Sequence, residues 1–355
     1  MEIKDIDKNF NIETKIEEKD LKFISVLEKP FDLYGYCKGE KSFRRLPAAV
    51  AENVNEGVEV LASNTAGVRV RFCTDSPYIA ISVKYPNILK LPHMPFTGTT
   101  GFDMYSCENG KYIFEKTFVP PIDIKDGYEG IHYFETKKMR DITINFPLYN
   151  DVSEVYIGLA ESAEIGHGGK YNNEKPIVYY GSSITQGGCA SRPGNSYQAI
   201  VSRDLNYDYV NLGFSGSARG EDEIIDYINS LEMSCFVLDY DHNAPDYKFL
   251  SETHEPMFKK IRARNPDLPI IIMSMPYCNT LRDVKERKEV IKATYDNAVK
   301  SGDKNVYFID GEVLFDIFGG DSGTVDGIHP NDLGFMCMAK AVRECLEKID
   351  IGVTV

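Results

Sequence analysis

A short apolar run passes into a turn of glycine and serine in the stretch Ile177-Val178-Tyr179-Tyr180-Gly181-Ser182-Ser183-Ile184-Thr185-Gln186-Gly187. Similar apolar runs recur toward the C-terminus, and each is followed by a segment in which apolar residues recur at helical spacing. The predicted strands are 177–180, 209–212, 236–239, 270–274 and 306–309, and the predicted helices lie near 197–205, 221–231, 255–264, 283–300 and 331–348. Strands that alternate with helices predict an α/β domain with a parallel, doubly wound sheet.

Upstream of this region, apolar residues alternate with polar ones from about Val68 to Tyr156. The alternating positions are Val68, Val70 and Phe72, then Ile79, Ile81 and Val83, then Phe102, Met104, Tyr112 and Phe114, and finally Ile142, Ile144 and Phe146. Glu108-Asn109-Gly110 is a hairpin signal, and the series predicts an antiparallel β-sandwich. The segment 85–100 carries three prolines and is predicted to be a long loop. We place the boundary near residue 170, between an N-terminal sandwich domain (1–170) and a catalytic domain (171–355).

The charge, hydropathy and cysteine content of the chain limit its expected binding partners and cellular location. Asp and Glu total 54 against 40 Lys and Arg, which gives a formal charge of −14. A field of this sign repels nucleic acid and anionic membrane surfaces, so neither is an expected partner. The N-terminus does not have the pattern of a secretory signal and no run is apolar enough to cross a bilayer, so we expect a cytoplasmic protein unless a leader has been removed. The eight cysteines are scattered, which favours reduced thiols.

Residues that could take part in catalysis follow four of the five predicted strands. The functional residues of a parallel sheet gather at the carboxyl ends of its strands. Ser183 follows the first strand in a glycine-flanked turn, and Gly216 follows the second in Gly213-Phe214-Ser215-Gly216. Asn243 follows the third strand and offers an amide donor. Asp326 and His329 follow the last strand, three residues apart, so that the carboxylate can reach the imidazole ring. Together they supply a nucleophile, a base, an orienting acid and oxyanion donors, which is the inventory of an acyl-transfer site.

This order of residues resembles the SGNH hydrolases, also called the GDSL esterase and lipase family. The resemblance covers roughly 175–348, and its most characteristic pieces are Asn211-Leu212-Gly213-Phe214-Ser215-Gly216 and Asp326-Gly327-Ile328-His329-Pro330. The chain also resembles the branch that carries a sandwich before the catalytic domain, as some carbohydrate esterases do. The resemblance implies a flavodoxin-like three-layer α/β/α domain preceded by a jelly-roll-like sandwich.

The resemblance also implies a role for each motif residue. Ser183 would be the nucleophile, His329 the general base and Asp326 its orienting acid. The oxyanion donors would be the backbone N–H groups of Ser183 and Gly216 and the side chain of Asn243. Two positions depart from the family pattern, because Ser182 stands where an aspartate is usual and Asp241 where a glycine is usual.

Each motif has a purely structural alternative when it is taken alone. Gly-Ser turns and strand-end Asn or Gly are common turn chemistry, and Asp326 with His329 would also suit a helix cap. The order of all four motifs, each after its own strand, favours the catalytic interpretation. Arg192 and His242 are candidates for substrate contact. A surface arginine explains Arg192 at least as well, and for His242 a solvent-facing loop histidine is favoured over substrate contact. Cys189 is interpreted as a small structural residue.

Other chemistries find little support in the sequence. No histidine pair has helical ligand spacing and no cysteines have zinc-finger spacing, so we expect no metal. No G-x-G-x-x-G follows the first strand, and we expect no nucleotide or other cofactor.

The sequence thus predicts a serine esterase that removes short acyl groups, acetyl in particular, from a small-molecule or oligosaccharide ester, through an acyl-Ser183 intermediate. The alternatives are a general lipase or thioesterase and a carbohydrate-binding protein that has lost activity. The sandwich domain would bind glycan, shape the active-site rim or only cover an apolar face. A homo-oligomer is left open.

Overall fold

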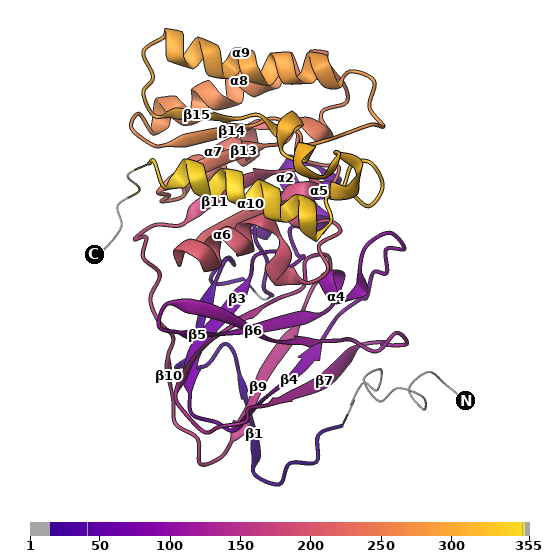
Figure 1. The fold of residues 1–355 in the computed structure, drawn as a ribbon, viewed down its shortest axis with the longest axis vertical. Helices are drawn as coiled ribbons and strands as arrows, with labels where there is room; N and C mark the ends of the chain where they lie inside the picture. Colours follow the sequence, from indigo (N-terminus) through magenta and orange to yellow (C-terminus); the bar gives the residue numbers. More distant parts are fainter. Residues whose placement is uncertain (1–14, 41, 350, 352–355) are drawn as a thin grey trace.

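The computed structural model describes residues 15–40, 42–349 and 351, and it contains a β-sandwich below an α/β domain in the view of Figure 1. The first sheet of the sandwich has the strand order β1 (Leu21–Ser25), β9 (Glu154–Ala160), β4 (Tyr78–Lys84) and β7 (Gly127–Tyr133). The second has the order β10 (Ile165–His167), β3 (Arg69–Thr74), β8 (Arg140–Asn145), β5 (Phe102–Glu108) and β6 (Lys111–Phe118), and β2 (Asp32–Tyr34) also pairs with β3. All pairs are antiparallel, and apolar side chains such as Phe72, Ile81 and Ile144 are buried between the sheets.

The clearly alternating segments form the expected strands β3, β4, β5, β6 and β8, which confirms the antiparallel prediction. Strand β7 was not foreseen, because Gly127 and Gly130 interrupt its apolar pattern. A Cβ atom at Gly130 would lie 2.9 Å from Cδ1 of Phe118, so the ring of Phe118 packs where a side chain would otherwise stand. Glycine in a strand at such a site permits close packing and weakens the sequence signal.

The α/β domain contains a five-stranded parallel sheet. Its strand order is β12 (Tyr209–Gly213), β11 (Ile177–Gly181), β13 (Cys235–Asp239), β14 (Ile270–Met273) and β15 (Val306–Ile309). This is the order 2-1-3-4-5 of flavodoxin-like folds, which confirms the predicted fold class. The order reverses between β11 and β13, so the loops that follow these two strands lie at the switch point of the sheet, where open α/β sheets usually bind their ligands.

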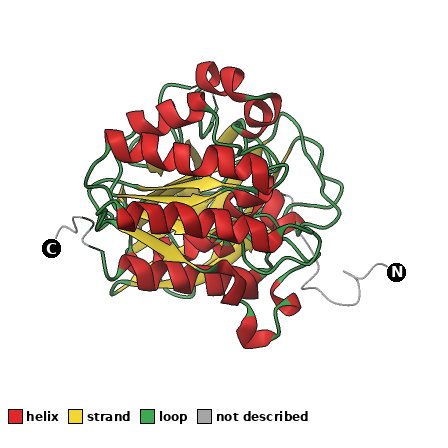
Figure 2. Cartoon of the chain, turned by 90° about the horizontal axis from the view of Figure 1, so that it is seen from above, coloured by secondary structure: helices red, strands yellow, loops and turns green. Residues whose placement is uncertain are grey.

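Helices cover both faces of this sheet (Figure 2). One face packs against α6 (Tyr197–Leu205) and α10 (Asp332–Leu346), and the other against α7 (Asp222–Ser230), α8 (Tyr247–Arg264) and α9 (Val284–Lys300). Alternate residues of β11 point to opposite faces, because Tyr179 belongs to the first core and Tyr180 to the second. The near-continuous apolar strands are therefore explained by burial on both faces.

Two helices of the N-terminal region pack on the α/β domain. They are α2 (Ala48–Val54) and α3 (Glu56–Leu61), and their buried residues Ala51 and Val58 share a core with Ile224 of α7. The side-chain amide of Asn55 donates to the Ser217 carbonyl at 3.0 Å. The sandwich region and the α/β domain therefore share a core.

Two further expectations concern the state of the cysteines and the presence of membrane-spanning helices. All eight cysteines are free. Within the residues that the structure describes, no helix is both long and apolar enough to cross a membrane.

Candidate active site

Ser183 begins a one-turn helix, α5 (Ser183–Gln186), directly after β11. The Ser182 hydroxyl caps this helix by accepting a hydrogen bond from the Ile184 N–H at 3.2 Å. Gly181 approaches β13 so closely that a Cβ atom there would lie 2.0 Å from the Asp239 carbonyl oxygen. The tight strand-to-helix turn therefore requires glycine before the two serines, and it presents Ser183 at the carboxyl edge of the sheet.

Ser183, His329 and Asp326 form one continuous hydrogen-bonded chain. The Ser183 Oγ lies 2.9 Å from Nε2 of His329, and Nδ1 of the same ring lies 2.7 Å from Oδ2 of Asp326. The other carboxylate oxygen, Oδ1, accepts the backbone N–H groups of Ile328 at 3.1 Å and His329 at 2.8 Å. The Asp326 carboxylate thus stabilises the conformation of its own loop and orients the His329 ring at the same time.

The charge state of Asp326 suits this role. Burial alone would raise the pKa of Asp326, but the hydrogen bonds from the backbone and ring of His329 and from Ile328 hold the pKa below its usual value. The carboxylate is therefore ionised at neutral pH and accepts the proton of Nδ1. Nε2 is then left with a lone pair that can take a proton from Ser183, which makes the serine a competent nucleophile.

Gly216 and Asn243 lie on the loops that follow β12 and β13, the two strands that flank β11. The Asn243 side-chain amide donates to the Phe214 carbonyl at 2.8 Å, and its second N–H remains available to another acceptor. Gly216 has a φ of +69°, which favours glycine. Among the described residues, the backbone N–H groups of Ser183 and Gly216 have no hydrogen-bond acceptor. Free donors of this kind can stabilise negative charge on a reacting oxygen.

The loops that carry these groups are braced from the sandwich side by Arg45. Its guanidinium is buried and donates to the carbonyls of Asn211 at 2.9 Å, Gly213 at 2.8 Å and Asn64 at 2.7 Å. Burial lowers the pKa of Arg45 to about 9. A cation that satisfies several backbone carbonyls fixes the strand end before Gly216.

Gln186 adds a second brace to the Gly216 loop. Its side-chain carbonyl accepts the Ser215 N–H at 3.0 Å, and its amide donates to Asn64 Oδ1 at 3.0 Å. Tyr149 of the sandwich donates to the Ser183 carbonyl at 3.1 Å. Sequence reasoning assigned no role to Arg45, Gln186 or Tyr149. Gln186 belongs to the quoted turn motif, but the importance of all three depends on contacts between distant segments.

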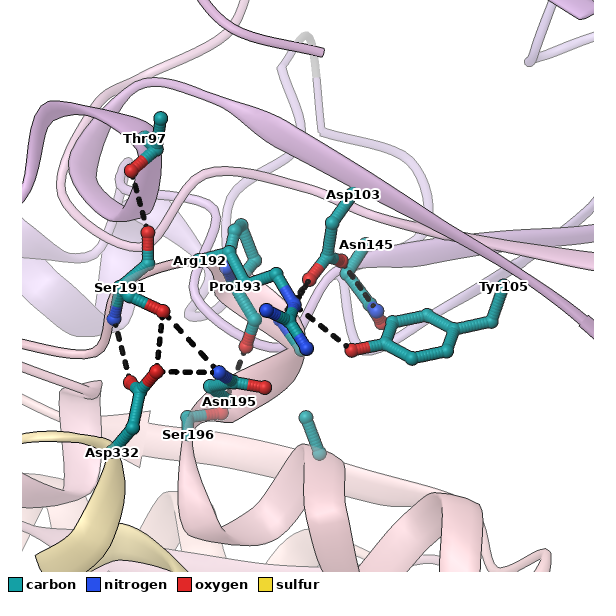
Figure 3. A network of polar contacts seen from close by, with 12 residues as sticks. Thr97, Asp103, Tyr105, Asn145, Ser191, Arg192, Pro193, Asn195, Ser196 and Asp332 are labelled. Carbon is teal, nitrogen blue, oxygen red and sulfur yellow. Dashed lines mark hydrogen bonds and ion pairs between the residues drawn. The ribbon is translucent and has the colours of Figure 1, made fainter. Parts of the chain in front are cut away.

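Arg192 lies in the interface between the two domains (Figure 3). Its Nε donates to the Tyr105 hydroxyl at 3.2 Å and lies 3.5 Å from Oδ2 of Asp103, a fully buried carboxylate. The guanidinium also lies over the Phe114 ring at 4.2 Å. Within the part of the chain that the structure describes, Arg192 makes no contact with Ser183, Asp326 or His329. The structure therefore does not place Arg192 beside Ser183.

The segment around Arg192 is also tied to the loop of His329. Asp332, three residues after His329, accepts the Ser191 N–H at 2.8 Å and the Asn195 side-chain amide at 2.7 Å (Figure 3). From the sandwich, the Thr97 hydroxyl donates to the Ser191 carbonyl at 2.6 Å. This network links the sandwich loop, the segment after α5 and the start of α10.

His242 differs from the solvent-facing histidine that the sequence suggested. Its Nε2 is buried and has no hydrogen-bond partner among the described residues. Burial, with smaller contributions from His329 and Arg287, lowers the pKa of His242 to about 3. His242 is therefore half-buried and neutral, with its Nε2 turned away from solvent, and is not a fully solvent-facing ring. Asp241, before it, accepts the Met275 N–H at 2.8 Å and so docks this turn on the end of β14.

The proline-rich loop 85–100 reaches the triad. It ends in the short helix α4 (Phe96–Thr99), and the Asn150 side chain holds it by accepting the Leu89 N–H at 2.7 Å. The exposed ring of His93 lies 5.6 Å, between centroids, from the ring of His329. The sandwich thereby contributes part of the rim around Ser183.

Among the described residues, one group of side chains could together ligate a metal ion: His93, Cys189 and His329. Each offers one ligand atom, and these atoms lie within 4.8 Å of one another. Burial, with a smaller contribution from Asp326, raises the pKa of Cys189 to about 12, so its thiol is neutral and a weak nucleophile. The sequence spacing did not reveal this group, because its members come from three separate segments.

Comparison with known proteins matches both parts of the chain. The model of the GDSL-like lipase/acylhydrolase family matches residues 174–347, and a model for the N-terminus of SGNH-hydrolase-type esterases matches residues 21–165. The chain is similar to a protein from Bacteroides ovatus described as a GDSL-like lipase, with 30% identity, a TM-score of 0.83 and coverage of 92% of this chain and 97% of that one.

Two more distant structures share the fold. A salicylyl-acyltransferase from a tetracycline biosynthetic pathway is 19% identical, with a TM-score of 0.75 and coverage of 94% of this chain and 98% of that one. An acetyl xylan esterase from the rumen bacterium Butyrivibrio proteoclasticus is 14% identical, with a TM-score of 0.54 and coverage of 92% of this chain and 98% of that one. No protein with a curated description matches the sequence.

Proposed function

Because this chain belongs to the GDSL-like lipase/acylhydrolase family, we propose that it is a serine esterase that hydrolyses short acyl esters, acetate in particular, on a carbohydrate. The observation that carries the reaction type is the continuous chain from Ser183 Oγ through His329 to Asp326, with links of 2.9 Å and 2.7 Å. An inactive binding protein would be expected to lack one of these groups. All three are present and in hydrogen-bonding geometry.

The mechanism follows from the roles that this geometry allows. Ser183 Oγ attacks the ester carbonyl carbon while its proton passes to Nε2 of His329. The N–H groups of Ser183 and Gly216 and the amide of Asn243 stabilise the negative oxygen of the tetrahedral intermediate. The intermediate collapses to acyl-Ser183, and the leaving alcohol takes the proton from Nε2. A water molecule, deprotonated by His329, then releases the carboxylic acid and restores Ser183.

Three considerations support a carbohydrate ester as the substrate. The loop 85–100 brings a polar, exposed side chain, His93, to the rim of the site, where it can contact a substrate hydroxyl. The fold is shared with an acetyl xylan esterase, which adds support by analogy. The formal charge of −14 disfavours anionic lipids and phosphorylated thioesters. A general acylhydrolase is the competing function.

The oxyanion role of Asn243 predicts a loss of turnover in Asn243→Ala. Removal of one donor to a developing oxyanion costs on the order of 10²–10³ in kcat, with little change in KM. Steady-state kinetics on p-nitrophenyl acetate measure both constants. An unchanged kcat would remove Asn243 from the site, and thermal unfolding of the variant checks that loss of its bond to Phe214 has not unfolded the loop.

Contact between His93 and the sugar predicts a selective loss in His93→Ala. Loss of one hydrogen bond to the sugar should reduce kcat/KM on acetylated xylo-oligosaccharides by about tenfold. The same variant should keep its kcat/KM on p-nitrophenyl acetate, whose leaving group makes no such contact. The ratio of the two values is the measurement.

A matched control is Lys90→Ala on the same loop, because the Lys90 ammonium donates to the Ile122 carbonyl of the sandwich and lies over the Phe96 ring. Its ratio should equal that of the wild type. If His93→Ala lowers both activities equally or neither, the general acylhydrolase is the better description.

A further inference from the structure

Three potential metal ligands converge at His329, and the proposed hydrolysis by Ser183 uses only His329 itself. His93 comes from the sandwich loop, Cys189 from the segment after α5, and His329 from the loop after β15. Their ligand atoms lie within 4.8 Å of one another. His93 is exposed and Cys189 is buried, so the group extends from solvent to the interior of the site.

The orientation of His329 determines which of its nitrogens faces this group. Nδ1 is held by Asp326 at 2.7 Å and Nε2 contacts Ser183 Oγ at 2.9 Å, so a cation reaches this ring by replacing Ser183 at Nε2. A carboxylate behind a histidine is also the usual support of a metal-ligating imidazole, because it fixes the ring and increases its basicity. The Asp326–His329 pair therefore suits a metal ligand as well as a general base.

The donor set selects the class of cation. Two imidazole nitrogens and one sulfur suit zinc, which takes N and S ligands in tetrahedral geometry and leaves the fourth position to water. Calcium and magnesium require oxygen ligands, and the group contains none. On binding, the Cys189 thiol would release its proton to solvent, because the thiolate is the ligand.

From this arrangement we infer that His93, Cys189 and His329 form an inhibitory site for zinc and similar divalent cations. A cation on Nε2 of His329 occupies the lone pair that accepts the proton of Ser183, so the bound enzyme cannot activate its nucleophile. The inhibition rests on the proposed esterase activity, whereas the binding does not. Zinc here is a reversible inhibitor and no cofactor, so removal of metal leaves the enzyme active.

The binding is tested with cobalt(II), which replaces zinc and gives a thiolate-to-cobalt charge-transfer band in the near ultraviolet. Metal-free wild-type protein should develop this band on titration with cobalt(II), and zinc should abolish it. Cys189→Ser keeps the size and polarity of the side chain but provides no thiolate, so its spectrum should lack the band. Cys73→Ser removes a thiol of the sandwich strand β3 and should retain it.

The inhibition is tested on p-nitrophenyl acetate with the same proteins. Zinc should inhibit the wild type, an excess of EDTA should restore full activity, and magnesium or calcium should have no effect. Loss of one ligand should raise the zinc concentration for half-inhibition by about tenfold or more in Cys189→Ser, which keeps its activity without metal. Cys189→Ala provides a second variant if the serine form does not fold.

The outcomes separate the two proposals. Absence of the cobalt band in the wild type, persistence of the band in Cys189→Ser, or equal zinc inhibition of wild type and Cys189→Ser would each overturn the metal site. A thiol-dependent band in a protein that hydrolyses no ester would leave the metal site standing and overturn the esterase function.

Discussion

We expect ester hydrolysis to fall by about 10⁴–10⁶ in kcat when Ser183 is replaced by alanine, because the only proposed nucleophile is lost. The fold should remain intact. In the described part of the chain the Ser183 hydroxyl has one hydrogen-bond partner, Nε2 of His329, and the residue is 6% exposed at the carboxyl edge of the sheet. The measurement is kcat on p-nitrophenyl acetate, together with circular dichroism and thermal unfolding.

Ser182→Ala is the matched control for this experiment. Its hydroxyl is also buried, but it accepts the Ile184 N–H and caps α5. Loss of a helix cap costs about 1 kcal/mol of stability and does not remove the nucleophile, so most of the activity should survive. If Ser182→Ala is the inactive variant and Ser183→Ala the active one, the assignment of the nucleophile is wrong.

The positions of the triad residues in the fold were predictable from local patterns. A parallel sheet places the carboxyl ends of all its strands along one edge, so residues that follow β11 and β15 meet although 146 positions separate Ser183 and His329. The Asp326–His329 contact is even more local, since three residues of separation and a glycine at φ +83° bring carboxylate and ring together. Strong apolar periodicity made the first inference possible, and short sequence separation made the second.

The surroundings of the triad were not predictable in the same way. Arg45 binds the carbonyls of Asn211 and Gly213 across more than 160 positions, and no pattern near Arg45 marks that contact. His242 follows a strand, as Asn243 does, but whether a loop side chain turns toward solvent or into the protein depends on tertiary packing. The same holds for Arg192, which binds Tyr105 and Phe114 of the sandwich. Such features are seen only in the three-dimensional structure, because they depend on how segments that are distant in the sequence pack together.

The dependence of His329 on Asp326 gives the last prediction, made with Asp326→Asn. The asparagine carbonyl can still accept the N–H groups of Ile328 and His329, so the loop should keep its shape. Its amide would then donate to Nδ1 of His329, which places the ring proton on Nε2. A protonated Nε2 cannot accept the proton of Ser183, and kcat should fall by about 10⁴.

The matched control for this change is Asp310→Asn. Asp310 directly follows β15, caps a short turn by accepting the Glu312 N–H at 3.2 Å, and is 35% exposed against 34% for Asp326. It makes no contact with the triad within the described residues, so its variant should hydrolyse p-nitrophenyl acetate at nearly the wild-type rate. Nitrogen-15 NMR of the His329 ring adds a readout that misfolding would not mimic, because it reports which nitrogen carries the proton. If the proton stays on Nδ1 in Asp326→Asn, or if kcat is unchanged, Asp326 does not set the state of the base, and another acid must be sought for that role.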